Sequence, residues 1–277
     1  VILEGAEILR SGLIGLSISE GGSASAKLSG ISDSTGVNVK LRESSYIDMH
    51  ASTCKGSGSN NLEVSSASTA DAGSCDLTGA GGSGILAQYG STVNARLSDA
   101  SNAGVDGVRA LSRSTVNADG ITANDSTMNG VTSDNSTIAM ESAEVLRSGV
   151  DGLNATNSSV VGSVLANISD SVGNNVESSY GSIVDIHGGT AINAGVDNLN
   201  CFNGGKISAG SVTATGAGSR GANVNGGEIT LLSSDISGSG GLADLLTQNG
   251  AIVRFGSGTG TFGGSANTLT SAGIIFQ

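Results

Sequence analysis

The most constraining feature of this sequence is an internal repeat of about 23 residues. Three consecutive repeats begin YGSTVNARLSDAS at residue 89, SRSTVNADGITAN at residue 112 and DNSTIAMESAEVL at residue 134. A distant pair shows the same period, because EGAEILRSG at residues 4–12 returns as ESAEVLRSG at residues 141–149. Periods of roughly 20–50 residues are typical of solenoids and related architectures, so the repeat decides the fold before any division by length does.

Each repeat contains short stretches in which apolar and polar residues alternate. Val93 and Ala95 flank the polar Asn94, and a later stretch of the same repeat reads GVDGVRA at residues 104–110. Alternation over a few residues predicts a β-strand that buries one face. Gly, Asn, Ser and Asp cluster between the stretches and supply turns, including residues with positive φ.

Two or three short strands per repeat predict an all-β fold, a right-handed single-chain parallel β-helix (solenoid) of about twelve coils. Leucine-rich repeats need a Leu/Asn consensus that is missing here, and propeller blades need about 40 residues. Stacked coils enclose a narrow interior that small side chains can fill. The composition agrees, because 277 residues include only four Phe, three Tyr and no Trp or Pro.

The repeat predicts two regions, a parallel β-helix over residues 1–248 and an irregular segment over residues 249–277. Aligning Glu4 with Glu141 places Val1 inside a strand, so we expect the β-helix to be an N-terminally truncated fragment of a longer chain. Three of the four Phe residues lie in the last segment. It is predicted to be either a C-terminal cap on the last coil or a trimer-contact segment.

Composition excludes several classes of function. A net charge of −12 argues against nucleic acid, whose phosphates need Lys and Arg. No apolar run approaches the ~18 residues of a membrane span, so we expect no membrane insertion. The Gly-rich phrases lack the GxxxxGK pattern of phosphate loops, and we expect no cofactor. Cys54, Cys75 and Cys201 have no metal-binding spacing, so we expect no metal and three free, buried thiols.

The 23-residue repeat, the phrases GSTVNA (residues 90–95) and AGVDGV (residues 103–108), and the ending NTLTSAGIIFQ (residues 267–277) resemble the shaft of a bacteriophage tailspike or tail fibre. Those shafts are pectate-lyase-like parallel β-helices. The resemblance implies a homotrimeric virion tail protein that faces the extracellular medium, contacts other virion tail proteins and attaches to bacterial cell-surface glycans. It also implies that depolymerase activity is common. No catalytic motif of the family is present, so no family active-site residue is carried over.

Stacking of coils allows neighbours in space to be predicted from the repeat. Equivalent positions of successive coils lie about 5 Å apart, which places Asp48 next to Asp71 on an outward strand face. Retaining glycosidases separate their two carboxylates by a similar distance, so this pair is the candidate catalytic site of a polysaccharide hydrolase or lyase. Five charged or titratable residues of the same face are candidate binding residues: Lys27, His50, Arg96, Asp119 and Glu141. The alternative is a solvated face with no ligand.

The acidic residues outside this face are predicted to have structural roles. Asp106, Asp151 and Asp197 recur in the phrase GVDG or GVDN, and without the repeat pattern of calcium-binding β-helices they are predicted to hydrogen-bond within turns. Glu177 is predicted to point outward and to form a surface ion pair of little energy.

The favoured function is a phage tail-fibre or tailspike segment for host-surface attachment, with receptor binding to bacterial surface polysaccharide. The first alternative is a polysaccharide depolymerase that uses Asp48 and Asp71. The second is a monomeric bacterial surface adhesin. The scarcity of aromatic platforms for sugar stacking favours a structural shaft over an enzyme. An unbroken Thr row would favour ice binding, but Tyr46 and Val160 interrupt the row that contains Thr92 and Thr115.

Overall fold

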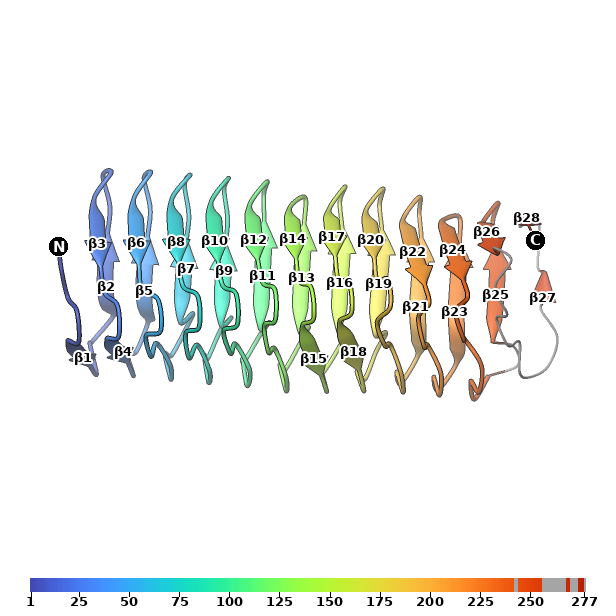
Figure 1. The fold of residues 1–277 in the computed structure, drawn as a ribbon, viewed down its shortest axis with the longest axis horizontal. Coiled ribbons are helices and arrows are strands. Elements are labelled where there is room, and N and C mark those ends of the chain that lie inside the picture. The colour runs from blue at the N-terminus through green and yellow to red at the C-terminus, as the bar shows by residue number, and fades with distance from the viewer. Residues whose placement is uncertain (242–243, 256–267, 270–273, 277) are drawn as a thin grey trace. The chain divides into compact units, whose positions relative to one another are not determined.

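The computed structural model describes residues 1–241, 244–255, 268–269 and 274–276. Within these residues the secondary structure consists of strands and turns with no helix. The strands form a parallel β-helix of about 11 turns with about 23 residues per turn (Figure 1). The predicted fold class is therefore confirmed, with a number of turns close to the twelve expected. The right-handed sense stays a prediction. No helix of the described residues is long and apolar enough to cross a membrane.

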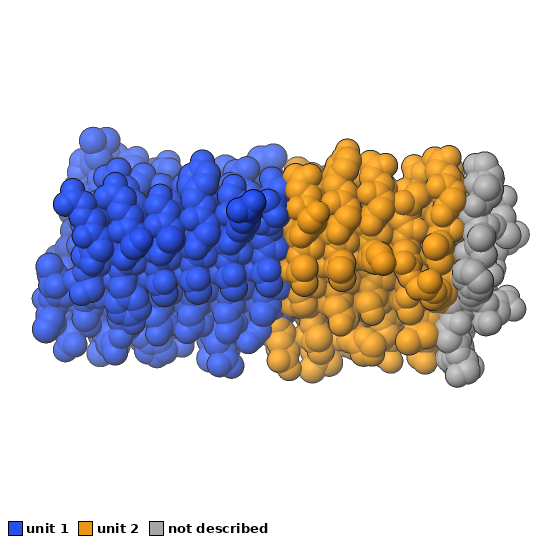
Figure 2. Space-filling view, turned by 90° about the horizontal axis from the view of Figure 1, so that it is seen from above, with its two compact units in different colours: residues 1–140 blue, residues 141–277 orange. Residues whose placement is uncertain are grey.

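The chain divides into two compact units, Val1–Met140 and Glu141–Gln277, coloured blue and orange in Figure 2. The predicted boundary at residue 249 falls inside the second unit. Strand β26 (Ile252–Phe255) pairs in parallel with strand β24 (Glu228–Leu232), so the ladder of the second unit continues past residue 249. Most of residues 249–277 lie outside the described residues, and their role as a cap or trimer contact stays a prediction.

Unit 1 is built from coils with three sides. The first side is a parallel sheet of six short strands: β3 (Ser23–Ser25), β6 (Tyr46–Asp48), β8 (Thr69–Asp71), β10 (Thr92–Asn94), β12 (Thr115–Asn117) and β14 (Thr137–Ala139). The second side is the sheet of β2 (Ile14–Ile18), β5 (Val37–Leu41), β7 (Leu62–Val64), β9 (Ile85–Ala87), β11 (Val108–Leu111) and β13 (Val131–Asp134). The third side has the strands β1 (Glu7–Leu9) and β4 (Gly30–Ser32), followed by single bridges at Thr53, Asp76, Asp99 and Thr122.

Unit 2 has the same three sides. Its first sheet contains β17 (Val160–Gly162), β20 (Ile183–Asp185), β22 (Lys206–Gly210), β24, β26 and β28 (Ile274–Phe276). Its second sheet contains β16 (Leu153–Thr156), β19 (Val176–Ser179), β21 (Asp197–Phe202), β23 (Arg220–Asn225), β25 (Leu245–Gln248) and β27 (Thr268–Leu269). The third side has β15 (Glu144–Leu146) and β18 (Asn167–Ser169), then bridges at Thr190, Thr213 and Asp235.

The core of each coil is thin and aliphatic, as the composition predicts. Val93 and Val116 are register partners on β10 and β12, and both are fully buried. Asn94 and Asn117, which follow them, point outward and are half-buried. Burial of one Val, Leu or Ile side chain stabilises the fold by about 1.5–3 kcal/mol, so the stacked apolar rows provide the main driving force.

Polar rows also run through the interior and fix the register of the coils. One row is formed by buried serines, in which the hydroxyl of one coil accepts the backbone N–H of the previous coil. The N–H of Ser91 donates to Ser114 Oγ at 3.3 Å, and the N–H of Ser114 donates to Ser136 Oγ at 3.1 Å. We call the buried residues Ser45, Ser68, Ser91, Ser114 and Ser136 the serine row. Because each bond joins equivalent positions, slippage by one residue would leave buried groups unpaired.

The turns use left-handed backbone, as the clusters of Gly, Asn and Ser predict. Tyr89 and Gly90 have φ angles of 56° and 71°, and Tyr180 and Gly181 repeat this pair in unit 2 with 49° and 75°. Asn135 and Asn203 occupy equivalent turn positions, also with positive φ. Asn tolerates this conformation better than most residues with a side chain, which explains its frequency in the turns.

The three cysteines are free and buried, as predicted. Burial raises the pKa of Cys75 to about 11 and that of Cys201 to about 12. Burial also raises the pKa of Cys54 well above its usual value. Since the thiolate is the reactive form, these thiols are inert packing residues.

Candidate functional site

The predicted carboxylate pair lies where the repeat places it. Asp48 on β6 and Asp71 on β8 are register partners on the first side of unit 1, and both are half-buried. Their hydrogen-bond partners differ. Lys27 Nζ lies 2.7 Å from Asp48 Oδ2, whereas Asn94 Nδ2 donates to Asp71 Oδ1 at 3.0 Å. The adjacency is therefore observed, and the catalytic role of the pair stays a prediction.

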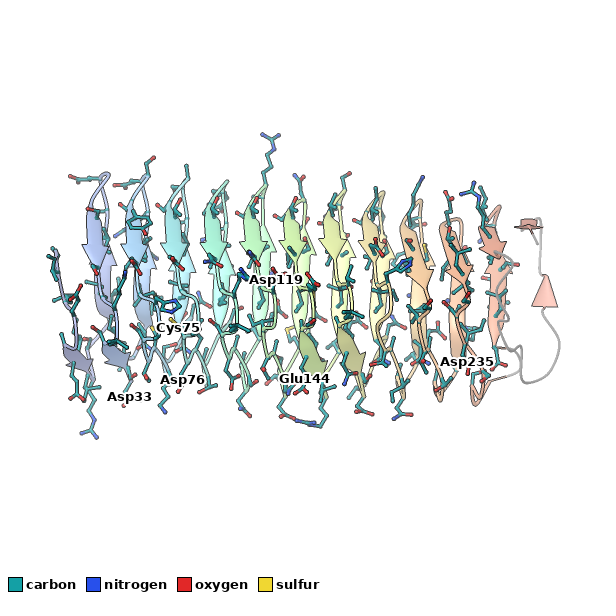
Figure 3. The ribbon with its side chains drawn as sticks, in the orientation of Figure 1. Asp33, Cys75, Asp76, Asp119, Glu144 and Asp235 are labelled. Carbon is teal, nitrogen blue, oxygen red and sulfur yellow. The ribbon has the colours of Figure 1, made fainter. Side chains whose placement is uncertain are left out.

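Four of the five predicted binding residues belong to the same side of unit 1. Lys27 pairs with Asp48, and this hydrogen bond and charge raise the pKa of Lys27. Arg96 Nε lies 3.7 Å from Asp119 Oδ2, so two further predicted residues form an ion pair (Figure 3). His50 is exposed and leans over Gly73, where an added Cβ would lie 2.9 Å from His50 Nδ1.

Glu141, the fifth predicted binding residue, is the first residue of unit 2. The contribution of Glu141 to a glycan site stays a prediction. Both cations among the four residues of unit 1 are paired, Lys27 with Asp48 and Arg96 with Asp119. These residues can hydrogen-bond to a ligand. Because Lys27 and Arg96 are each paired with a carboxylate, they do not form a cluster of unpaired cations that would bind an anionic polymer.

Two outward rows give this side of unit 1 a repetitive hydrogen-bonding surface. The first row is exposed and contains Ser23, Tyr46, Thr69, Thr92, Thr115 and Thr137. The second row is half-buried over most of its length and contains Ser25, Asp48, Asp71, Asn94, Asn117 and Ala139. Each coil thus presents a hydroxyl beside a carboxylate, amide or second hydroxyl, except at the last coil. We call this surface the threonine face.

The third side of unit 1 carries a second carboxylate pair that the sequence interpretation missed. Asp76 and Asp99 are bridge partners on consecutive coils. Burial acts to raise the pKa of Asp76, but hydrogen bonds from Thr78 and the Lys55 charge outweigh it and lower the pKa. Thr78 Oγ1 donates to Asp76 Oδ1 at 2.7 Å and Lys55 Nζ lies 3.3 Å from Asp76 Oδ2, so Asp76 is an ionised structural group (Figure 3).

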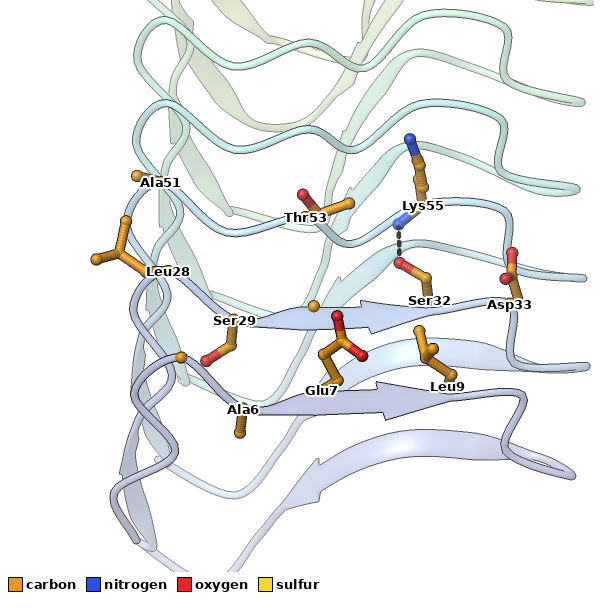
Figure 4. Close-up of a pocket in the computed structure, with 12 residues that line it drawn as sticks. Ala6, Glu7, Leu9, Leu28, Ser29, Ser32, Asp33, Ala51, Thr53 and Lys55 are labelled. Carbon is orange, nitrogen blue, oxygen red and sulfur yellow. Dashed lines mark hydrogen bonds between the residues drawn. The ribbon is translucent and has the colours of Figure 1, made fainter.

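A hollow opens on the same side at the first coils of unit 1 (Figure 4). Ala6, Glu7 and Leu9 line it, and so do Ser32 and Lys55, where the backbone N–H of Lys55 donates to Ser32 Oγ at 3.4 Å. The hollow gathers none of the predicted site residues. It is lined by two carboxylates, Glu7 and Asp33, by Lys55 and by mostly small or aliphatic residues, which is too little to define a ligand.

Unit 2 carries a denser polar cluster on the outward face of its second side. Asn154 Nδ2 donates to Asp151 Oδ2 at 3.2 Å and to Glu177 Oε1 at 3.4 Å. Asn174 Nδ2 and Asn200 Nδ2 donate to Glu177 Oε2 at 2.9 Å and 3.0 Å. We call the cluster of Asp151, Asn154, Asn174, Glu177, Asp197 and Asn200 the acid–amide face.

The acid–amide face corrects two sequence-based interpretations. Glu177 makes hydrogen bonds to three amides instead of the predicted surface ion pair. Asp151 accepts the backbone N–H of Asn174 at 2.7 Å, one coil later, and Asp106 accepts the N–H of Asn129 at 3.0 Å in the same way. These aspartates therefore bond between coils and not within turns. The sequence contained an indication of this pairing, because Asn129 and Asn174 stand one repeat after Asp106 and Asp151.

Burial changes the proton affinity of these carboxylates. It raises the pKa of Asp151, and it raises that of Glu177 together with the charge of Asp151. It also raises the pKa of Asp197, although Arg220 acts in the opposite direction. Among the described residues, no group of three or more His, Cys, Asp or Glu side chains could hold a metal ion. The face is therefore suited to hydrogen bonding rather than to metal coordination.

An aromatic pair borders the acid–amide face. The rings of Tyr180 and Phe202 have centroids 6.0 Å apart and an interplanar angle of 74°, an edge-to-face arrangement. Phe202 follows Asn200 by two residues on β21, so the two side chains share the outward face of this strand. Phe202 lies one coil after Tyr180, because its register partner is Ser179.

No protein-family model matches the sequence, and no curated protein matches it significantly. Among solved structures, the A-module of the mannuronan C-5 epimerase AlgE6 from Azotobacter vinelandii is similar to 95% of this chain and 91% of its own, with 12% identity and a TM-score of 0.45. The enzymatically active domain of tailspike protein 2 from bacteriophage CBA120 is similar to 91% of this chain and 42% of its own, with 10% identity and a TM-score of 0.49.

Proposed function

We propose that this chain is a β-helical segment of a phage tail fibre or tailspike that attaches to the host by binding bacterial surface polysaccharide. The observation that supports this most is the threonine face of unit 1. Thr92 and Thr115 are exposed register partners, and Asn94 and Asn117 repeat beside them with the same register. A surface of this kind suits a linear polymer better than a compact ligand.

The chemistry of the threonine face matches that of sugar hydroxyls. A hydroxyl group both donates and accepts, a carboxylate accepts, and an amide does both through separate atoms. Each coil of the threonine face except the last combines two of these groups, and coils recur at the strand spacing of about 4.8 Å. A polysaccharide laid along the coils would therefore meet similar partners at successive sugar units.

Single contacts of this kind are weak, so we propose that multivalency supplies the affinity. A homotrimer displays three copies of the face, and linked binding events raise the overall avidity by orders of magnitude without new contacts. In the proposed virion tail, other tail proteins would hold the trimer so that it faces the extracellular medium. The segment 249–277 is the candidate trimer contact.

Binding to immobilised polysaccharides tests the proposal. Purified lipopolysaccharides and capsular polysaccharides from a panel of bacteria are presented to the chain in biolayer interferometry. Replacing Thr92 and Thr115 together by Val should weaken binding at least tenfold. Replacing Thr53 and Thr122, which lie on the third side of unit 1, by Val is the matched control and should change little. Failure of the chain to bind any member of the panel would reject the proposal.

Light scattering after size exclusion tests the proposed assembly. The full chain should have the mass of a trimer, and the chain without residues 249–277 should lose it. A monomer in both cases would remove the proposed trimer contact and favour the monomeric surface adhesin.

A depolymerase is the second candidate function, and the register pairing of Asp48 with Asp71 favours it. Two neighbouring carboxylates with different hydrogen-bond partners are the starting arrangement for acid–base work on a glycosidic bond. The exposed His50 and the paired Lys27 flank this site.

A further inference from the structure

We infer that the acid–amide face of unit 2 is a subsite for one sugar ring that is neutral or carries an amino group, with Tyr180 as its stacking surface. The inference rests on the proposed glycan-binding function and adds a second site and a ligand class to it. It concerns residues of unit 2 alone, so it is independent of the threonine face of unit 1.

The side-chain hydrogen bonds of this face converge on Glu177 from the preceding and the following coil. Asn223 Nδ2 donates to Asn200 Oδ1 at 3.2 Å, and Asn200 Nδ2 donates in turn to Glu177. Asn154 and Asn174 donate to the same carboxylate. The Glu177 carboxylate therefore accepts hydrogen bonds from three amide groups and fixes the orientation of each of them. A set of polar groups held in fixed orientations before binding is what a specific ligand site requires.

The aromatic pair gives the site an apolar wall. Tyr180 is 55% exposed, so one side of its ring is open to a ligand. The Phe202 ring meets Tyr180 at its edge and restrains it. Ser179 and Phe202 are register partners, and Glu177 lies only two residues before Ser179, so the aromatic wall and the amides are adjacent. A sugar ring offers an apolar C–H surface to the aromatic ring while its hydroxyls reach the amides.

A buried acceptor without a hydrogen bond marks the same face. Asp197 is only 2% exposed, and its Oδ1 atom has no hydrogen-bond partner. The nearest cation is Arg220, whose Nη1 atom lies 3.6 Å from Oδ1, beyond hydrogen-bond distance. An unpaired buried acceptor costs about 1–3 kcal/mol. The Arg220 side chain is partly exposed, and its movement away from Asp197 would leave this oxygen for a ligand donor.

The charge of the face selects the ligand class. Asp151, Glu177 and Asp197 supply three carboxylates, and Arg220 lies against only one of them. A further anion placed beside these three carboxylates would be repelled. Hydroxyl and ammonium groups are donors and would be attracted. The face therefore favours a hexose or an amino sugar and disfavours a uronate.

Calorimetric titration with three defined oligosaccharides tests the inference. The probes are pentamers of glucosamine, N-acetylglucosamine and mannuronate. The wild-type chain should bind the first two and not the third. Tyr180→Asn should weaken this binding at least tenfold, and Asn is compatible with this turn because Asn203 occupies the equivalent position with positive φ. Tyr89→Asn is the matched control, since Tyr89 is an exposed Tyr at the equivalent turn of unit 1.

Glu177→Gln adds a test of charge. It should reduce binding of the glucosamine pentamer more than binding of the N-acetylglucosamine pentamer, because only the former is cationic. Circular dichroism and the thermal midpoint of each variant establish that the fold is retained. Equal binding of the mannuronate pentamer, or equal effects of Tyr180→Asn and Tyr89→Asn, would overturn the inference.

The outcomes separate this subsite from the proposed function. A chain that binds a bacterial polysaccharide through Thr92 and Thr115, and is indifferent to Tyr180→Asn, keeps the proposed function and loses the subsite. A chain that binds neither the polysaccharide panel nor any pentamer loses both.

Discussion

The side-chain amide of Asn38 donates to Oδ1 of Asn61 at 2.9 Å, and the two residues occupy equivalent positions of consecutive coils. Asn61 is fully buried, and its own amide donates to the carbonyl groups of Leu77 at 2.6 Å and Thr78 at 2.9 Å. Its Oδ1 atom also accepts the N–H of Ser57 at 3.1 Å. One side chain therefore satisfies backbone groups of two turns as well as the neighbouring asparagine.

Asn61→Ala should destabilise unit 1 strongly. The change leaves Ser57 N–H, the Asn38 amide and two carbonyl oxygens without this partner, and one unsatisfied buried group costs about 1–3 kcal/mol. We expect a loss of at least about 2 kcal/mol in the free energy of unfolding, measured by denaturant titration. Thr115→Ala, on the exposed row, is the control and should stay within about 0.5 kcal/mol. Equal effects would mean that Asn61 has no special role.

Two glycines of unit 2 should respond in opposite ways to an added methyl group. At Gly152 a Cβ would lie 2.4 Å from Ile168 Cγ2 and 2.6 Å from the Asn175 carbonyl oxygen. At Gly162 nothing lies within 4 Å. Gly152→Ala should therefore destabilise by about 1–3 kcal/mol, as overpacking does, and Gly162→Ala should be neutral or stabilise by up to about 1 kcal/mol. Thermal midpoints of the two variants check this, and a tolerated Gly152→Ala would contradict the close packing.

The three thiols should be protected in the folded protein. Burial raises the pKa of Cys75 to about 11 and that of Cys201 to about 12, so the fraction of thiolate at pH 8 is small and the sulfur atoms are inaccessible. We expect no rapid reaction with a disulfide reagent at pH 8 and three equivalents of reaction after denaturation, since the chain has three cysteines. Fast labelling of one thiol in the native protein would contradict this prediction and would mean that the coil around that cysteine unfolds locally.

The acid–amide face should make stability depend on pH in a defined direction. Burial raises the folded-state pKa of Asp151 above its unfolded value of about 3.9. Between these two values the folded protein binds more protons, so the stability contributed by Asp151 falls as pH rises through this window and stays low above it. Asp151→Asn removes the group. The stability of the variant relative to the wild type should therefore increase between pH 4 and pH 7, and parallel pH curves would contradict this.

The carboxylates on the first side of unit 1 allow a test of depolymerase activity. If the chain releases reducing ends from a polysaccharide that it binds, Asp48→Asn and Asp71→Asn should each lower the rate at least 100-fold, as loss of general acid–base catalysis does. Loss of the Lys27–Asp48 ion pair itself should cost less than about 1 kcal/mol, so the fold will survive. Activity that persists in both variants would end the catalytic assignment of this pair.

The fold was predictable from sequence because the strand pattern, the turn residues and the repeat period all indicate the same architecture. Alternation around Asn94 sets the strand, the turn residues set its ends, and the 23-residue period sets the register that brings Asp48 beside Asp71. In a parallel β-helix, equivalent positions must stack, so the neighbours of a residue follow from counting along the chain. The same counting places Thr92 beside Thr115.

The acid–amide face was not predictable in the same way. Counting does place Asn154, Glu177 and Asn200 in one row, but it does not show that three amides would turn their nitrogen atoms toward one carboxylate. Nor does it show that Asp151 would accept a backbone N–H from the next coil instead of bonding in its own turn. Those choices depend on how deeply each side chain is buried and on competition between local and inter-coil partners.

The serine row has a consequence for how such a chain can change over evolutionary time. Each serine hydroxyl is matched to the backbone of the adjacent coil, and Ser91, Ser114 and Ser136 are interchangeable in that role. Loss or duplication of one whole repeat would therefore join two surfaces that already fit, whereas an insertion of a few residues would break the match. Recombination between repeats can thus lengthen or shorten the coil stack while the outward residues diverge independently toward new ligands.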